Sequence, residues 1–183
     1  MASVITATTT SGLTQSADNS GVLQLASGTG NLVTVPSVTG TAMVSGNMPA
    51  FAVWGSSGTS LTNNINTKIT YDTEEFDTNN NFASSRFTPT VAGYYQLNAN
   101  LLLVSSSSGI LGITVYKNGS LFKNGSQIVN SGDYIGANIS VLVYANGTTD
   151  YFEIYSLQNN GTTRTTLGGQ AYNWFQGSLV RTA

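Results

Sequence analysis

Apolar and polar residues alternate in short runs along the second half of the chain. Residues 110–116, 139–144 and 151–155 are such runs, and they are rich in β-branched and aromatic side chains. A period of two with this composition predicts β-strands that bury one face. No segment places apolar residues at i, i+3, i+4 and i+7 over three turns, so the sequence predicts essentially no helix.

Further strands are expected on the same grounds, and together they predict an antiparallel jelly-roll-like sandwich of about eight to ten strands. They are Ala50–Trp54 and residues 65–71, 94–104 and 172–180. The apolar run from Leu101 to Val104 predicts burial on both faces at the end of its strand. Phe76, Phe82 and Phe87 are placed in polar loops.

Two Asn-Gly pairs, at 118–119 and 146–147, each stand between two predicted strands. Both central residues of a type I′ turn need φ > 0, which Asn and Gly tolerate, so each pair predicts a β-hairpin. Gly93 precedes the longest predicted strand and is expected to have φ > 0 as well.

Residues 1–48 differ from the rest, because they contain no aromatic residue and one charged residue, Asp18. Their short alternating fragments predict strands that cannot bury a core alone. We therefore expect an N-terminal assembly arm, residues 1–48, beside a jelly-roll domain, residues 49–183; a disordered tail is the alternative. The residues expected to anchor the arm are Val22, Leu23, Leu25, Leu32, Val33 and Val35.

The composition excludes several functions. Charged residues make up 8% of the chain and the net charge is −2, which argues against nucleic-acid binding. The absence of cysteine and histidine removes disulfides, thiolates and the commonest general base. No apolar run approaches the roughly 20 residues that span a bilayer. The first residues do not form a signal peptide, so we expect assembly in a cytoplasm and no membrane insertion.

Asp72, Glu74, Glu75 and Asp77 form the one concentration of charge in the sequence. Several carboxylates in a short segment are weak candidates for a Ca²⁺ site. Their spacing does not fit the D-x-[DN]-x-[DN]-G pattern, so a solvated loop without a metal or cofactor is the expected structure.

A pair of these carboxylates also matches the minimum requirement of a glycosidase. That chemistry needs a carbohydrate groove and an apolar setting that raises the pKa of the acid. The neighbouring residues are mostly Asn and Thr. We therefore expect no enzymatic activity.

Several segments resemble the C1q/TNF-like superfamily, and together they span about residues 50–181. Residues 87–97 resemble its strand with Phe, Pro, Gly and Tyr, and residues 115–119 resemble its Lys-Asn-Gly hairpin. Residues 144–155 occupy the place of its L-x-x-G-D-x-V pair, with Asp150 as a loose match, and residues 175–180 resemble its closing strand. The resemblance implies a ten-stranded jelly roll that forms a homotrimer, with aromatic residues at the three-fold seam.

The large aromatic set is accordingly interpreted as core and trimer seam, with a sugar-stacking surface as the alternative. The residues assigned to core or seam are Trp54, Phe87, Tyr94, Tyr95, Tyr151, Trp174 and Phe175. Trp174 is expected inside the sandwich. The loops 105–109 and 158–168 are the candidates for outward contacts.

Residues 14–25 and 35–41 resemble segments of tailed-bacteriophage virion proteins. This resemblance implies a virion structural protein, a trimeric capsid decoration or head-fibre protein, whose arm binds the major capsid protein or another virion protein. The alternative is a tail-fibre tip adhesin that binds a glycan of the host surface. A secreted ligand or lectin of a cellular organism is a third class, and it would need an export signal.

Overall fold

The structure is a computed structural model that describes residues 23–26, 32–35, 48–104, 108–130 and 133–183. The chain divides into two units, Met1–Thr41 and Ala42–Ala183. In the first unit, β1 (Leu23–Ala26) pairs antiparallel with β2 (Leu32–Val35). The predicted anchoring residues Leu23, Leu25, Leu32, Val33 and Val35 lie on these strands, and Val22 lies outside the described residues. The boundary at residue 48 and the anchoring role stay predictions.

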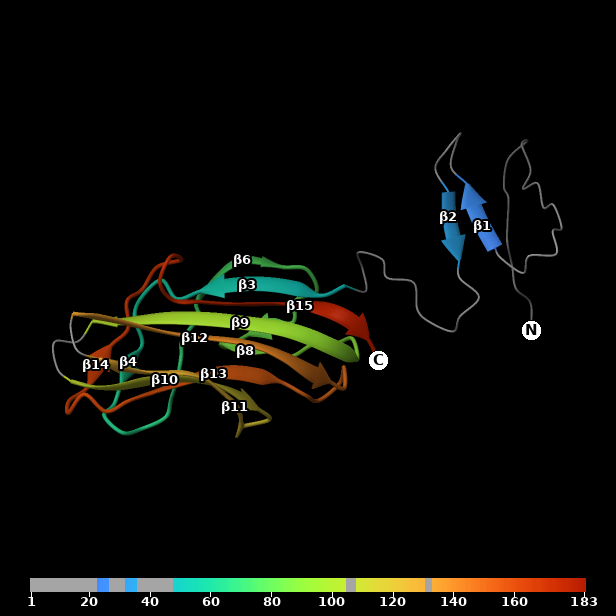
Figure 1. Cartoon of the computed structure of the whole chain (residues 1–183). Coiled ribbons are helices and arrows are strands. Elements are labelled where there is room, and N and C mark those ends of the chain that lie inside the picture. Colours follow the sequence, from blue (N-terminus) through green and yellow to red (C-terminus); the bar gives the residue numbers. More distant parts are fainter. Residues whose placement is uncertain (1–22, 27–31, 36–47, 105–107, 131–132) are drawn as a thin grey trace. The chain divides into compact units, whose positions relative to one another are not determined.

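The second unit is a sandwich of two antiparallel sheets (Figure 1). The β9 sheet has the order β12 (Tyr134–Ala145), β9 (Gly93–Val104), β15 (Trp174–Thr182), β3 (Ala50–Trp54) and β6 (Thr73–Asp77). The β10 sheet has the order β11 (Ser120–Asn130), β10 (Gly109–Lys117), β13 (Phe152–Gln158), β8 (Arg86–Phe87) and β7 (Phe82–Ala83), with β5 (Thr67–Lys68) also beside β13. A small pair joins β14 (Arg164–Thr165) to β4 (Ser60–Leu61). The described residues contain no helix, so the all-β prediction is confirmed for them.

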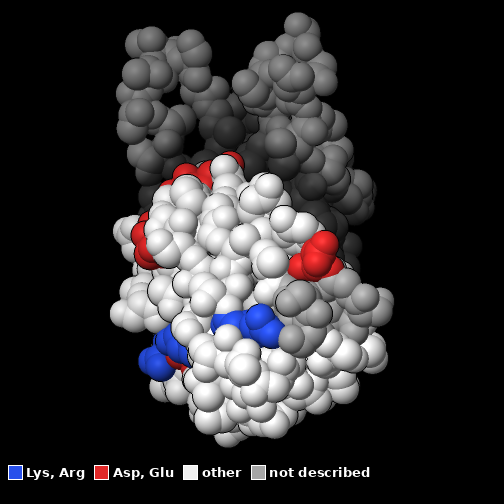
Figure 2. Space-filling model, turned by 90° about the vertical axis from the view of Figure 1, so that its left-hand side faces the viewer, with Lys and Arg blue, Asp and Glu red and all other residues white. Residues whose placement is uncertain are grey.

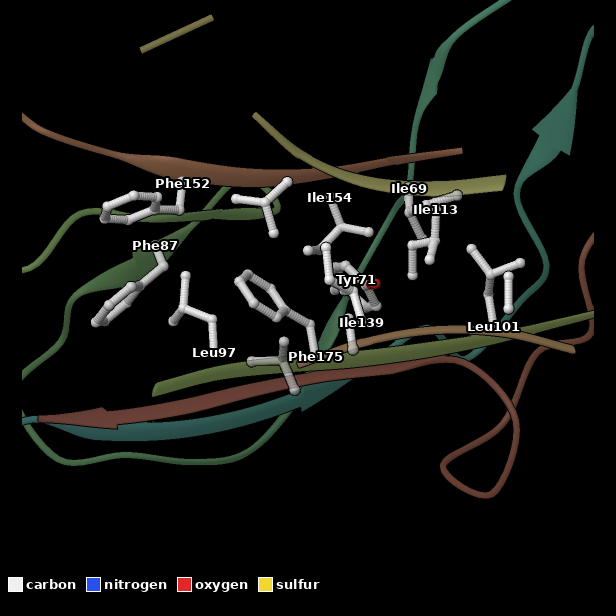
Figure 3. Close-up of a cluster of buried hydrophobic side chains, with 14 of the residues drawn as sticks. Ile69, Tyr71, Phe87, Leu97, Leu101, Ile113, Ile139, Phe152, Ile154 and Phe175 are labelled. Carbon is white, nitrogen blue, oxygen red and sulfur yellow. The ribbon is translucent and has the colours of Figure 1, made fainter. Parts of the chain in front are cut away.

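The core lies between these two sheets because their strands alternate buried and outward residues. On β9 the buried positions are every second residue from Tyr95 to Leu103. Figure 3 shows Phe152 and Ile154 meeting Leu97 and Phe175 between the two layers. This alternation is the period of two that the sequence displays, with the apolar set facing inward.

Three strand predictions need correction. Residues 65–71 form a strand only at Thr67–Lys68; Ile69 is buried, whereas Ile65 is exposed. Phe76, Phe82 and Phe87 lie on the strands β6, β7 and β8 and not in loops. The end of β9 is not buried on both faces, because Val104 is exposed. Short edge strands with polar sequences carry too weak a period for recognition from sequence alone.

The two Asn-Gly pairs have different roles. Asn118 and Gly119 have φ values of 54° and 77° and join β10 to β11, so the first hairpin is confirmed. The second hairpin prediction is wrong, because β12 pairs with β9 and β13 pairs with β10. The connection at 146–150 therefore crosses from one sheet to the other. Asn146 Oδ1 shapes it by accepting N–H groups of Thr148, Thr149 and Asp150, each at 3.0 Å.

Gly93 is required for close packing and is not among the residues with positive φ. A Cβ atom at this position would lie 2.4 Å from the carbonyl oxygen of Arg181.

Trp174 is also placed differently from the prediction. It lies on the outward face of β15, and its neighbour Phe175 fills the core.

We expect Phe175→Ala to lower the free energy of unfolding by about 3–5 kcal/mol, because a fully buried ring is lost and a cavity remains. Ser178→Ala, on the outward face of the same strand, should change it by less than about 0.5 kcal/mol. Urea titrations at one fixed protein concentration measure both values. Equal effects of the two substitutions would contradict the placement of Phe175.

Candidate functional site

The acidic residues of the predicted cation site are dispersed. Ser56 donates to Asp72 through its backbone N at 2.7 Å and its Oγ at 2.6 Å, which lowers the pKa of Asp72. Glu75 accepts from Gln170 at 2.9 Å, and Asp77 accepts from the backbone N of Phe82 at 2.7 Å. Among the described residues, no three acidic side chains come together as a metal ion requires.

The outward face of the β9 sheet carries the most distinctive surface of the sandwich. Its central positions are small or polar, and include Asn98, Ser140, Gln176 and Ser178. Both ends of the face carry aromatic side chains, so the face has two separate aromatic surfaces. Figure 2 views a different side of the molecule, the left-hand side of Figure 1, and that side is largely uncharged, with only scattered charged side chains.

One aromatic end consists of Tyr94, Leu142, Tyr144 and Val180, which we call the tyrosine patch. All four are exposed, and the rings of Tyr94 and Tyr144 have centroids 5.5 Å apart. Together with residues 181–183 they line a hollow of about 620 Å³. Exposed apolar side chains gathered in this way mark an interaction surface.

A second apolar surface lies on β11, the edge strand of the β10 sheet, and we call it the β11 edge. Leu121, Phe122, Ile128 and Val129 are exposed there. The backbone of β11 pairs with β10 on one side only. Its other side faces β12, to which Lys123 Nζ donates a hydrogen bond at the Leu142 carbonyl oxygen, 3.0 Å away. The exposed apolar side chains of β11, and not an open backbone edge, make it a candidate surface for association.

The aromatic end opposite the tyrosine patch contains both tryptophans of the chain. Trp54 on β3 and Trp174 on β15 are direct partners in the antiparallel register. A hollow of about 190 Å³ lies beside them and is also lined by Ala52, Val53, Glu75, Gln170 and Gln176. We call it the tryptophan hollow.

A buried carboxylate on the β10 sheet ties three strands together. Glu153 on β13 is 3% exposed and accepts from Lys68 Nζ at 2.7 Å and from Arg86 Nε at 3.0 Å. The guanidinium of Arg86 lies 3.8 Å from the ring centroid of Tyr151. Burial alone would raise the pKa of Glu153, but the hydrogen bonds and charges of Lys68 and Arg86 outweigh it and lower the pKa.

A similar arrangement fixes the connection between the sheets. Asp150 accepts from Lys117 Nζ at 2.8 Å, from Asn118 Nδ2 at 2.8 Å and from the backbone N of Asn146 at 3.0 Å. Burial opposes ionisation, but these donors lower the pKa of Asp150. Both carboxylates therefore connect elements of the fold, Glu153 through Oε1 and Asp150 through both of its oxygens.

The predicted core and seam residues separate into three groups in the structure. Phe87, Tyr95 and Phe175 are buried in the core, Trp54, Tyr151 and Trp174 are half-buried, and Tyr94 is exposed. The β11 edge was not among the predicted site residues. Successive side chains on a strand point to opposite faces, so the adjacent apolar residues Leu121 and Phe122 cannot both face the core. This pair is the sequence signal that could have identified the surface.

The predicted contact loops are only partly described. Residues 105–107 lie outside the described residues. In the loop 158–168, Gln158 is fully buried and its Nε2 donates to the carbonyl oxygens of Leu61 and Thr162, at 3.0 and 2.8 Å. The start of this loop is thus fixed inside the molecule, and residues 161–163 are exposed.

Comparisons with solved structures define the fold. The globular domain of zebrafish complement 1qA superposes with a TM-score of 0.56 at 17% identity, covering 74% of this chain and 98% of that one. The Eiger TNF of S. frugiperda gives 0.59 at 7% identity, covering 75% and 95%, and murine APRIL gives 0.54 at 7%, covering 73% and 99%. The chain therefore has a C1q/TNF-like jelly-roll fold.

No protein-family profile and no curated protein matches the sequence. In the part of the chain that the structure describes, no helix is long and apolar enough to cross a membrane. The solved structures share the fold at low identity, so the site has to be interpreted from its own residues.

We expect Glu153→Gln to lower the free energy of unfolding at pH 7 by about 1–2 kcal/mol, because two charge-assisted hydrogen bonds weaken while both cations keep access to solvent. The folded-state pKa of Glu153 is lowered, so its stabilisation is complete above the unfolded-state pKa of about 4.3 and is lost as the pH falls through the folded value.

Denaturation of both proteins between pH 7 and pH 3 measures this dependence. The difference in stability should shrink as the pH falls, and a difference that stays constant would contradict the ion-pair assignment. Glu74→Gln, which replaces an exposed carboxylate, is the control and should show little effect at any pH.

Proposed function

We propose that this protein is a non-enzymatic structural protein that assembles as a homotrimer, with the tyrosine patch of one copy against the β11 edge of the next. The observation that carries the proposal is that one chain exposes two different apolar surfaces. A contact between unlike surfaces is heterologous, and it closes into a ring when the rotation between successive copies divides a full turn. The sequence resemblance described above implies three copies.

The chemistry of both surfaces supports self-association. Each contains four exposed apolar side chains, and buried aromatic and aliphatic anchors dominate interface energies. The net charge of −2 gives little repulsion between identical copies. The polar centre of the β9 sheet face offers neutral hydrogen-bonding groups. These groups can bond to a neighbouring copy without the burial of an unpaired charge.

The trimer is proposed to be a tailed-phage virion component, a capsid decoration or head-fibre protein with residues 1–48 as its anchor. The support is the resemblance of residues 14–25 and 35–41 to virion proteins, together with the short paired strands β1 and β2. Two four-residue strands are marginal alone and gain stability by pairing with a partner. The major capsid protein or another virion protein is the proposed partner.

A tail-fibre tip adhesin that binds a host glycan is the second candidate. The observation that favours it is the pair of tryptophans beside Glu75 and two glutamines. All residues that line this hollow lie outside residues 1–48, the proposed anchor.

We expect the wild-type chain to have three times its mass of 19.1 kDa in size-exclusion chromatography with light scattering. Leu121→Asp should shift it to smaller species, because a carboxylate on the β11 edge would be desolvated in the ring contact. Ile65→Asp is the matched control, since Leu121 and Ile65 are both 54% exposed. A wild-type monomer, or equal effects of the two variants, would contradict the proposed interface.

Removal of residues 1–48 should abolish binding to particles that lack the protein, and leave the assembly state of residues 49–183 unchanged. Cosedimentation with such particles measures binding, and immunogold labelling of complete particles gives the location. Label over the head at many copies is the expected result. Label confined to the tail would favour the adhesin, and particles that bind the truncated chain equally well would contradict the anchoring role.

A further inference from the structure

Both tryptophans of the chain line one hollow on the outward face of the β9 sheet. Trp54 and Trp174 are opposite one another in the register of β3 and β15, so their side chains stand on the same face. They do not belong to the core, whose aromatic members on these two strands are Phe51 and Phe175. In Figure 1 β15, β3 and β6 lie side by side, and all three strands contribute to the hollow.

A bulge in β6 brings Glu75 to this hollow. Phe76 is opposite Ala52 and Glu74 is opposite Val53, which leaves Glu75 as the extra residue of β6. An extra residue bends its strand and redirects its side chain. Glu75 therefore lines the tryptophan hollow, whereas Glu74 lines a different one.

Backbone hydrogen bonds attach the loop that contains Gln170 to Gly55, the residue that follows β3. Gly169 N donates to the Gly55 carbonyl oxygen at 2.7 Å, and Gly55 N donates to the Asn173 carbonyl oxygen at 3.0 Å. The N–H groups of Tyr172 and Asn173 both donate to the Gly169 carbonyl oxygen at 3.0 Å, which closes the turn. Gln170 Nε2 then donates to Glu75 Oε2 at 2.9 Å, which joins the two side chains at the hollow.

We propose that the tryptophan hollow binds one ring of an uncharged saccharide. The C–H face of a sugar ring stacks on an aromatic face, and an indole offers the largest apolar face of any side chain. The carboxylate of Glu75 accepts hydrogen bonds from sugar hydroxyls, and the side-chain amides of Gln170 and Gln176 both donate and accept them. Aromatic walls with a few fixed polar groups are the usual construction of a ligand site.

The size and charge of the hollow define the ligand further. Its volume of about 190 Å³ is below the roughly 300–1,000 Å³ of sites that enclose drug-sized ligands, so it fits a single ring of a longer glycan. Among the described residues that line it, Glu75 is the one ionisable group. Its charge repels sulfated and sialylated sugars, which selects uncharged ones.

The site shares no residue with the tyrosine patch or with the β11 edge, and its one residue in the polar centre of the β9 sheet face is Gln176. Trp174 is opposite Asn100, and Tyr94 lies six positions before Asn100 on β9, so the tyrosine patch is about 20 Å away along the strand. The inference supplies the ligand class for the adhesin, the second candidate above, and rests on that role for its biological meaning. Loss of sugar binding would leave the assembly state unchanged, so the two proposals can fail separately.

Intrinsic tryptophan fluorescence tests the site directly, because the chain contains only these two tryptophans. We would titrate the full chain with tetrasaccharides of glucose, mannose, galactose and N-acetylglucosamine. At least one should give a saturable change in intensity and emission maximum. Light scattering on the same samples separates ligand binding from a change in assembly.

Variants that keep both tryptophans identify the polar contacts. Glu75→Ala and Gln176→Ala should each weaken binding by about tenfold, because each removes a hydrogen-bonding group that contacts the bound sugar. Glu74→Ala is the matched control, because it removes the neighbouring carboxylate outside the hollow and should leave the affinity unchanged. Glu75→Gln, which can keep the contact with Gln170, serves if Glu75→Ala fails to fold.

Three results would overturn the proposal. The first is the absence of a saturable fluorescence change with any of the four tetrasaccharides. The second is equal affinity of Glu75→Ala and Glu74→Ala. The third is tighter binding of sialyllactose, a heparin tetrasaccharide or tetramethylammonium than of every uncharged sugar, which would assign the hollow to a charged ligand.

Discussion

The stack of Phe51 on Phe87 is the contact on which the arrangement of the two sheets depends. Phe51 projects from β3 of the β9 sheet and Phe87 from β8 of the β10 sheet, and their ring centroids are 4.2 Å apart. Phe175 meets Phe51 edge-on at 4.9 Å. Gly177 is part of the same arrangement, because a Cβ there would lie 2.9 Å from Phe51 Cε1. The aromatic layer therefore fixes both the spacing of the sheets and the position of β15 against β3.

Because inward-facing residues form the core, the outward positions of these strands are available for contacts with other molecules. On β9 and β15 the buried residues alternate with outward ones, and the outward residues do not contribute to the core. Fold stability and surface chemistry are thus carried by alternate residues of the same strands. With so few charges, contacts at either end of this face depend on shape, aromatic area and hydrogen bonds, and little on long-range electrostatic attraction.

The sequence predicts what local rules determine. Residues 110–116 and 151–155 are recognisable as strands because alternation is a local pattern, and Asn118-Gly119 is recognisable as a hairpin because φ > 0 is a local demand. Strand pairing is different. Asn146-Gly147 has the same residue types, but only Gly147 has a positive φ, of 72°. The chain crosses to the other sheet there, because β13 is paired with β10 by contacts distant in sequence.

The sequence pattern also does not determine which of two adjacent aromatic residues on a strand faces the core. Trp174 and Phe175 are both large and apolar, so a period of two is satisfied with either one inside. The choice is made by the core, where Phe175 fits against Phe51. Trp174 is consequently on the outward face, and the expectation of a buried Trp174 fails for a reason that only tertiary packing supplies.

The acidic segment 72–77 shows the same principle at the level of a site. Asp72 accepts from Ser56 and Asp77 from the backbone of Phe82, so these two carboxylates have separate partners. Glu74 and Glu75 line different hollows, and the described carboxylates of this segment do not converge on one cation. The bulge instead separates Glu75 from Glu74 and brings it to Gln170, 95 positions further along the chain. Trp54, Glu75 and Trp174 meet only because β6, β3 and β15 are neighbours in the sheet. A hollow assembled in this way has no signature in any single segment, and strand order is the information that reveals it.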